Sequence, residues 1–127
     1  MRAWQYYHLV RMYGNLPWID KALNINDEGE IYGNREDRDM VMDKVLEDLD
    51  FAVTNIKDIP SKTTWSRSLA NAMKAEVCLY EGTFRKYRKN EDGQQAPDAT
   101  GAARYLTACK EACPVSYTHL TLPTTSR

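Results

Sequence analysis

Four segments of this 127-residue chain repeat apolar side chains every three or four positions, and this period restricts the fold more than any other feature. Such a period lines one side of an α-helix, because 3.6 residues complete a turn. The segments run from the start to Tyr13, and over about 38–56, 66–88 and 101–113. Outside the connection 15–34 no strand pattern competes with them. The sequence therefore predicts an all-α fold.

The first predicted helix ends at a stop pattern. Its apolar line consists of Ala3, Tyr6, Tyr7, Val10 and Tyr13. Gly14 stands where a helix favours a left-handed residue after its last turn, and Pro17 prevents the helix from resuming. Neither a cap nor a signal peptide precedes the pattern at Met1. We therefore expect the chain to begin inside a longer protein.

The second and third predicted helices each have one expected buried side. In the second these residues are Val41, Val45, Leu49, Ala52 and Ile56, and in the third they are Leu69, Met73, Leu79, Tyr80, Phe84 and Tyr87. Pro60 follows the second helix, and residues before a proline avoid the α region. Ser66 is suited to be the N-cap of the third.

The fourth predicted helix uses Ala102, Leu106, Cys109 and Cys113, and follows a polar loop expected at 90–100. Short loops between helices argue for antiparallel helical hairpins. Their order suggests tetratricopeptide-like units, although the sequence shows no regular repeat. The long connection 15–34 is the exception, and a short β-hairpin or an extended strip packed on the helices is expected there.

The last residues read differently from the rest. The stretch Val115–Thr125 resembles a translated sequencing adaptor, while a Thr-rich terminal strand is the alternative. We therefore expect residues 1–113 to form a partial helical domain and residues 114–127 to be a non-native tail. No functional role is assigned to the tail.

Composition excludes several kinds of function. The net charge is −1, and basic and acidic residues alternate along the chain, so nucleic-acid binding is not expected. No apolar run reaches the roughly 20 residues that span a bilayer. The three cysteines make no zinc pattern, and we interpret them as small buried residues. No cofactor is expected.

The acidic clusters give only weak support for a catalytic or metal-binding site. Glu47, Asp48 and Asp50 fall close together on the second helix, but we interpret them as surface charge and not as a hydrolytic pair. The oxygen-rich stretch 24–30 misses the spacing of a calcium loop and fits a solvated turn. His8 has no nucleophile partner. The chain is not expected to be an enzyme.

Aromatic residues outside the helices are the candidate ligand contacts. Trp18, Tyr32 and Trp65 lie in predicted connections, and aromatic faces with polar edges stack on sugar rings. Trp65 and Tyr32 are favoured over Trp18, which follows Pro17 at a helix exit and also fits a role in closing the core. Aromatic residues within the helices are expected in the core.

Four motifs in one order resemble the SusD/RagB family of nutrient-binding lipoproteins. An aromatic R-A-x-x-Y-Y-x-L-V-R-x-Y-G-x-x-P helix matches residues 2–17, and E-D-L-D-x-A matches 47–52. A long Ala-rich helix ends in Leu-Tyr-Glu-Gly-Thr-Phe-Arg-Lys-Tyr at 79–87, and a Y-L-x-x-C-x-x-A helix matches 105–112. The resemblance covers essentially everything before Pro114.

The resemblance implies a longer, tetratricopeptide-like protein that is lipid-anchored on the outer surface of the outer membrane. Such proteins bind oligosaccharides, or in some members peptides, and deliver them to a TonB-dependent SusC-like transporter. We expect the lipidated start and the C-terminal half of that pattern to lie outside this chain. A helical-repeat scaffold that binds protein partners is the alternative function.

Overall fold

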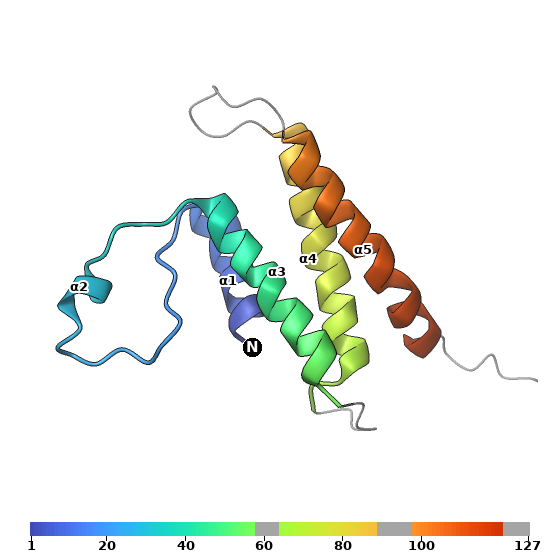
Figure 1. Ribbon diagram of the computed structural model, residues 1–127, viewed down its shortest axis with the longest axis horizontal. Coiled ribbons are helices and arrows are strands. Elements are labelled where there is room, and N and C mark those ends of the chain that lie inside the picture. The colour runs from blue at the N-terminus through green and yellow to red at the C-terminus, as the bar shows by residue number, and fades with distance from the viewer. Residues whose placement is uncertain (58–63, 89–97, 121–127) are drawn as a thin grey trace, which may run out of the picture. The chain divides into compact units, whose positions relative to one another are not determined.

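The computed structural model describes residues 1–57, 64–88 and 98–120, with side chains described as far as Pro114. Within these residues there are five helices and no strand: α1 (Arg2–Tyr13), α2 (Glu28–Ile31), α3 (Arg38–Asn55), α4 (Arg67–Tyr87) and α5 (Ala99–Leu120) (Figure 1). The predicted all-α, tetratricopeptide-like class is confirmed. Contacts divide the chain within α3 into two compact units, Met1–Asp48 and Leu49–Arg127.

The first unit contains α1, α2 and the first turns of α3. Its buried apolar side chains are Ala3, Tyr7, Val10, Val41, Met42, Val45 and Leu46. Arg2 at the start of α1 binds Asp48 on α3 through two hydrogen bonds of 2.7 and 2.6 Å. At the opposite end of α1, the Asn15 side chain accepts a 3.0 Å hydrogen bond from the Arg38 backbone N–H. Polar contacts therefore join the two helices at both ends of α1.

The stop of α1 is as the sequence predicted. Gly14 has φ +72°, a conformation that side chains rarely adopt, and its N–H donates to the carbonyl of Val10. Of the expected apolar line, Tyr6 is half-buried and Tyr13 is exposed. The placement of Tyr13 in the core was wrong, because the last turn of the helix extends beyond the residues that cover it.

The connection between α1 and α3 is a long loop closed at its base. An isolated antiparallel bridge pairs Leu16 with Glu36, whose N–H donates to the Leu16 carbonyl at 3.1 Å. The middle of the loop contains the four-residue helix α2, and no hairpin forms in it. Of the two alternatives expected for this connection, the β-hairpin was therefore wrong. Figure 1 shows the loop extending away from α1 and the start of α3.

The second unit is organised around the antiparallel pair α4 and α5, which lie side by side (Figure 1). Ser66 caps α4 as predicted, since its hydroxyl accepts from the Leu69 N–H at 3.2 Å. Gly82 lets the helices approach closely, because a Cβ there would lie 2.8 Å from the Leu106 Cγ. The expected antiparallel hairpin is confirmed by these contacts.

The buried side of α4 differs from the predicted one. Met73 is buried as expected, but Leu69, Leu79 and Tyr87 are 44%, 52% and 71% exposed. The buried residues are instead Ala70, Asn71, Met73, Val77, Cys78, Glu81, Gly82 and Arg85. At Gly82 the small residue is required, because α5 approaches there too closely for a side chain.

Two other helices also deviate from expectation. On α3, Val41, Val45 and Leu49 are buried as predicted, whereas Ala52 and Ile56 at its end are half-buried. The fourth helix was expected to stop at Cys113, but α5 continues through Pro114 to Leu120. Its buried residues include Tyr105 and Ala112 beside the predicted Ala102 and Cys109, while Leu106 is half-buried and Cys113 exposed. Pro60 and positions 90–97 of the expected loop lie outside the described residues.

Candidate functional site

Trp18, one of the predicted ligand contacts, is held on α1. Its ring centre lies 4.5 Å from that of Tyr6, at an interplanar angle of 37°. Two cations also face the indole: the Arg2 Cζ at 4.9 Å and the Lys44 Nζ at 5.4 Å from its ring centre. Such contacts attract through the negative charge on the ring faces. The indole is half-buried and occupied by side chains of its own unit.

The hydroxyl of Tyr6 fixes the backbone on both sides of Trp18. It accepts a hydrogen bond from the Ile19 N–H at 2.8 Å and lies 3.3 Å from the Pro17 carbonyl, to which it donates. Arg2 and Lys44 are in turn paired with Asp48 and Glu36. These contacts favour a structural role for Trp18, in which it packs at the end of α1, over a role in ligand binding.

Tyr32 has a different environment. It follows α2 as its C-terminal cap residue, and 83% of its surface is exposed. Its neighbours Ile31 and Ile25 are also exposed, at 45% and 93%. A salt bridge of 2.6 Å between Lys21 and Glu30 spans the loop beside it. Tyr32 is therefore accessible to a ligand, although the described side chains form no enclosed site around it.

Trp65 directly precedes the Ser66 cap of α4 and is half-buried. Trp18 and Tyr32 belong to the first unit and Trp65 to the second. Each of the three is therefore described within its own unit. Each stays a separate candidate for contact with a ligand.

Sequence reasoning missed an aromatic surface at the end of α4. Tyr80, Thr83, Phe84, Tyr87 and Arg88 line a shallow pocket of about 230 Å³. The Tyr80 and Phe84 ring centres lie 6.1 Å apart, and the Arg88 Cζ lies 5.9 Å from the Phe84 ring centre. The sequence placed these rings in the core. The spacing of these rings is the same as that of core residues in a helix. Only the burial of Glu81 and Arg85 shows that a different side of α4 is covered.

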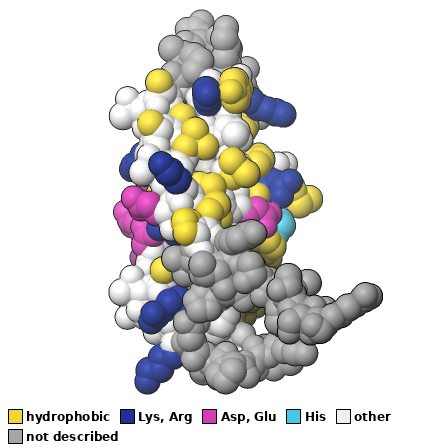
Figure 2. Space-filling view, turned by 90° about the vertical axis from the view of Figure 1, so that its right-hand side faces the viewer, with side chains coloured by type: hydrophobic (Ala, Val, Ile, Leu, Met, Phe, Trp, Pro, Cys, Tyr) yellow, Lys and Arg dark blue, Asp and Glu magenta, His cyan; other side chains and the backbone are white. Residues whose placement is uncertain are grey.

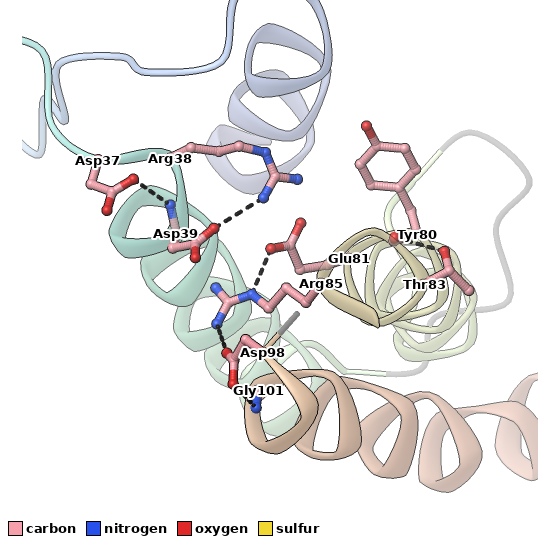
Figure 3. Close-up of polar contacts among 9 residues, drawn as sticks. All are labelled: Asp37, Arg38, Asp39, Tyr80, Glu81, Thr83, Arg85, Asp98 and Gly101. Carbon is pink, nitrogen blue, oxygen red and sulfur yellow. Dashed lines mark hydrogen bonds and ion pairs between the residues drawn. The ribbon is translucent and has the colours of Figure 1, made fainter. Parts of the chain in front are cut away.

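The charged residues near this surface connect α4 to the start of α5. Arg85 donates to Glu81 at 2.7 Å and reaches Asp98 at 3.5 Å, and Asp98 accepts a 2.8 Å hydrogen bond from the Gly101 N–H (Figure 3). Glu81 is fully buried and Arg85 is 8% exposed. This network ties α4 to the first turn of α5. Because the Glu81 carboxylate is buried and paired with Arg85, it is not accessible to a substrate.

Two of the three acidic residues noted on α3 form ion pairs. Asp48 binds Arg2, and Asp50 binds Lys74 at 2.7 Å. In the loop, the Asp27 carboxylate accepts from the Asn24 N–H at 3.0 Å. Within the described part of the chain, no three His, Cys, Asp or Glu side chains are placed to hold a metal ion.

Two of the three cysteines are buried, as predicted, and Cys113 is not. Burial raises the pKa of the Cys78 thiol to about 12, and burial is also the main cause that raises the pKa of Cys109. The Sγ atoms of Cys109 and Cys113 lie 3.9 Å apart on one side of α5. A buried thiol that keeps its proton is a poor nucleophile, so neither Cys78 nor Cys109 has the environment of a catalytic cysteine.

Comparison with known proteins identifies one informative relative. The chain is 36% identical over 87 residues to "SusD-like protein P2" of Formosa agariphila. The match covers 67% of this chain and 17% of that protein, so the chain spans a minor part of its relative's length. No protein-family model and no solved structure matches the chain. No helix among the described residues is long and apolar enough to cross a membrane. Over the 87 matched residues the chain is thus similar to a SusD-like protein.

Proposed function

We propose that this chain is part of a SusD-like nutrient-binding protein that captures oligosaccharides, or peptides, at the cell surface. The similarity to a SusD-like protein over 87 residues carries the proposal. The all-α fold with an antiparallel α4–α5 hairpin supports it, because it agrees with the tetratricopeptide-like architecture that the sequence motifs imply. The protein acts by binding and carries out no chemistry of its own.

Under this proposal the complete protein is lipid-anchored in the outer membrane and delivers its ligand to a TonB-dependent SusC-like transporter. Trp65 and Tyr32, and after them Trp18, are its proposed ligand contacts in this part of the chain. Tyr32 fits best by exposure, whereas Trp18 is already covered by Tyr6 and Arg2. Residues 114–127 are proposed to be a non-native tail.

Re-reading the source DNA across Cys113 tests both the tail and the family. Continuation in a SusD-like frame beside a gene for a TonB-dependent transporter supports the proposal. A stop codon or an unrelated frame directly after Cys113 contradicts it.

Co-purification tests the partner. The completed lipoprotein is expected to co-purify with its transporter and to bind oligosaccharides in calorimetry. If it binds protein partners but no saccharide or peptide, the scaffold function replaces capture. A Trp65→Ala or Tyr32→Ala variant with unchanged ligand affinity removes that residue from the site.

A further inference from the structure

Cys109 and Cys113 place two thiols next to each other on α5. The residues are four apart, so their side chains leave the helix on one side, and their Sγ atoms lie 3.9 Å apart. Cys109 is 9% exposed and Cys113 is exposed, so one thiol lies at the surface and the other just beneath it. Figure 2 views the side of the second unit on which α5 lies, where apolar side chains reach the surface between charged ones. The pair is therefore open to a small solute.

A direct disulfide does not suit this pair. Positions i and i+4 of a helix hold their Cβ atoms about 5–6 Å apart. A disulfide needs Cβ atoms about 3.5–4.5 Å apart, so its formation would require α5 to distort at this point. Both cysteines are free thiols. A single atom placed between the two sulfurs would bridge them without that distortion.

The separation of the two sulfurs matches the separation of two thiolates on one metal ion. With a metal–sulfur bond of about 2.3 Å, two thiolates lie about 3.8 Å apart on a tetrahedral ion and about 4.6 Å apart on a linear one. The observed 3.9 Å lies within this range. Thiolates are soft ligands and select soft ions such as Cu(I). The pair thus has the geometry and the chemistry of a soft-metal ligand set.

We propose that Cys109 and Cys113 together bind one soft monovalent metal ion of the Cu(I) class. Each thiol releases its proton to solvent, two metal–sulfur bonds form, and no electron is transferred. Burial raises the pKa of Cys109, but a thiol that coordinates a metal ion is deprotonated outright. This dithiolate site is separate from the residues proposed for ligand capture and does not depend on that function.

The ligand set argues against zinc as the occupant. Structural zinc takes four ligands, and catalytic zinc takes three protein ligands and a water. Within the part of the chain that the structure describes, no three His, Cys, Asp or Glu side chains are placed to hold one ion, so Cys78 on α4 does not complete the set. Monovalent ions such as Cu(I) and Ag(I) accept linear sites with two ligands. Two thiolates are therefore sufficient for an ion of this class.

Native mass spectrometry of the reduced 127-residue chain tests the proposal, with one equivalent of Cu(I) supplied under nitrogen as its acetonitrile complex. One ion per chain is expected, and competition with the chelator bicinchoninate measures the affinity. Cys109→Ser and Cys113→Ser should each weaken binding by more than about tenfold, since the loss of even an outer partner of a metal ligand costs about 10- to 100-fold. Cys113 is exposed, so Cys113→Ser is expected to keep the fold. Bound Cu(I) should also protect Cys113 from iodoacetamide, a measurement that needs no variant.

Cys78→Ala is the matched control, because Cys78 is fully buried on α4 and lies outside the pair. It should keep the affinity of the parent chain, and circular dichroism checks that each variant keeps its helix content. Unchanged affinity in Cys113→Ser or Cys109→Ser overturns the site, as does an equal loss in Cys78→Ala. Absence of binding, one ion shared between two chains, or unprotected labelling of Cys113 overturns it as well. These results leave ligand capture standing, because co-purification with the transporter tests it independently.

Discussion

Arg85 and Glu81, both on α4, form an ion pair of 2.7 Å, and both side chains are buried. The same guanidinium lies 4.8 Å from the Tyr105 ring centre and 3.5 Å from the Asp98 carboxylate. One cation thus contacts both helices of the hairpin. A buried ion pair contributes little by itself, but removing one partner leaves a charge in a medium that solvates it poorly.

Arg85→Met is therefore expected to lower the free energy of unfolding by about 3–5 kcal/mol, the range for breaking a buried pair. Urea unfolding followed by circular dichroism measures the change. Lys21→Ala removes an equally short but exposed pair with Glu30 and should leave the urea midpoint unchanged. Replacing both partners, Glu81→Leu with Arg85→Met, should recover much of the loss. Equal effects of the Arg85 and Lys21 changes would contradict a buried network.

Gly82→Ala should destabilise the chain by about 1–3 kcal/mol, although alanine favours helix more than glycine does. The added Cβ would meet the Leu106 Cγ at 2.8 Å and the Ala102 carbonyl oxygen at 3.3 Å. Gly29→Ala is the matched control, because nothing lies within 4 Å of a Cβ there. It should be neutral or slightly stabilising in a thermal melt. Partial rescue of Gly82→Ala by Leu106→Ala would locate the clash.

Tyr6→Phe should lower the unfolding free energy by about 1–2 kcal/mol, since the Ile19 N–H loses its 2.8 Å acceptor. Faster hydrogen exchange at the Ile19 amide is the local measurement. Tyr13→Phe removes an exposed hydroxyl from the same helix and should change neither quantity. Normal protection of Ile19 in Tyr6→Phe would show that the hydroxyl does not hold the loop exit.

The cysteines should differ in their reaction with iodoacetamide. Only a thiolate reacts, and the Cys78 thiol with a pKa of about 12 stays protonated at pH 8, whereas Cys113 is exposed. We expect Cys113 to be modified first, and Cys78 only after denaturation, as peptide mass spectrometry can show. Because the pKa of Cys78 is raised above its usual 9.0, its contribution to stability should be lost as the pH rises beyond about 9. Rapid labelling of Cys78 in the native chain would refute its burial.

The helices could be predicted from the sequence because their determinants are local. Ser66 caps α4, and Gly14 stops α1, through contacts within a few residues. The end of α5 could not be found in this way, since Pro114 and the change of composition after it suggested a stop. A proline does not end every helix in which it occurs. Because it has no N–H, the carbonyl four residues before it only loses one helical hydrogen bond.

The side of α4 that packs on α5 depends on residues distant in sequence, and there prediction failed. Glu81 and Arg85 have the i, i+4 spacing of a solvent-exposed pair. The contacts of Arg85 with Asp98 and with Tyr105 on α5 could not be anticipated from that spacing. For the candidate site the sequence identified Tyr32 as accessible but misplaced Tyr87 in the core. Aromatic residues fit both a core and a binding surface, so their chemistry alone does not separate the two.

The bridge between Leu16 and Glu36 closes the connection between α1 and α3 at its base, so the length of the connection can change without moving the two helices. With its base closed by backbone pairing and by the contact of Asn15 with Arg38, residues 20–32 can gain or lose positions while α1 and α3 keep their register. Lengthening a closed loop changes the closure entropy only slowly, by about 0.6 kcal/mol for each doubling. The tip around Tyr32 is therefore a position at which relatives can diverge, or a reporter peptide can be inserted, with little effect on the helical unit.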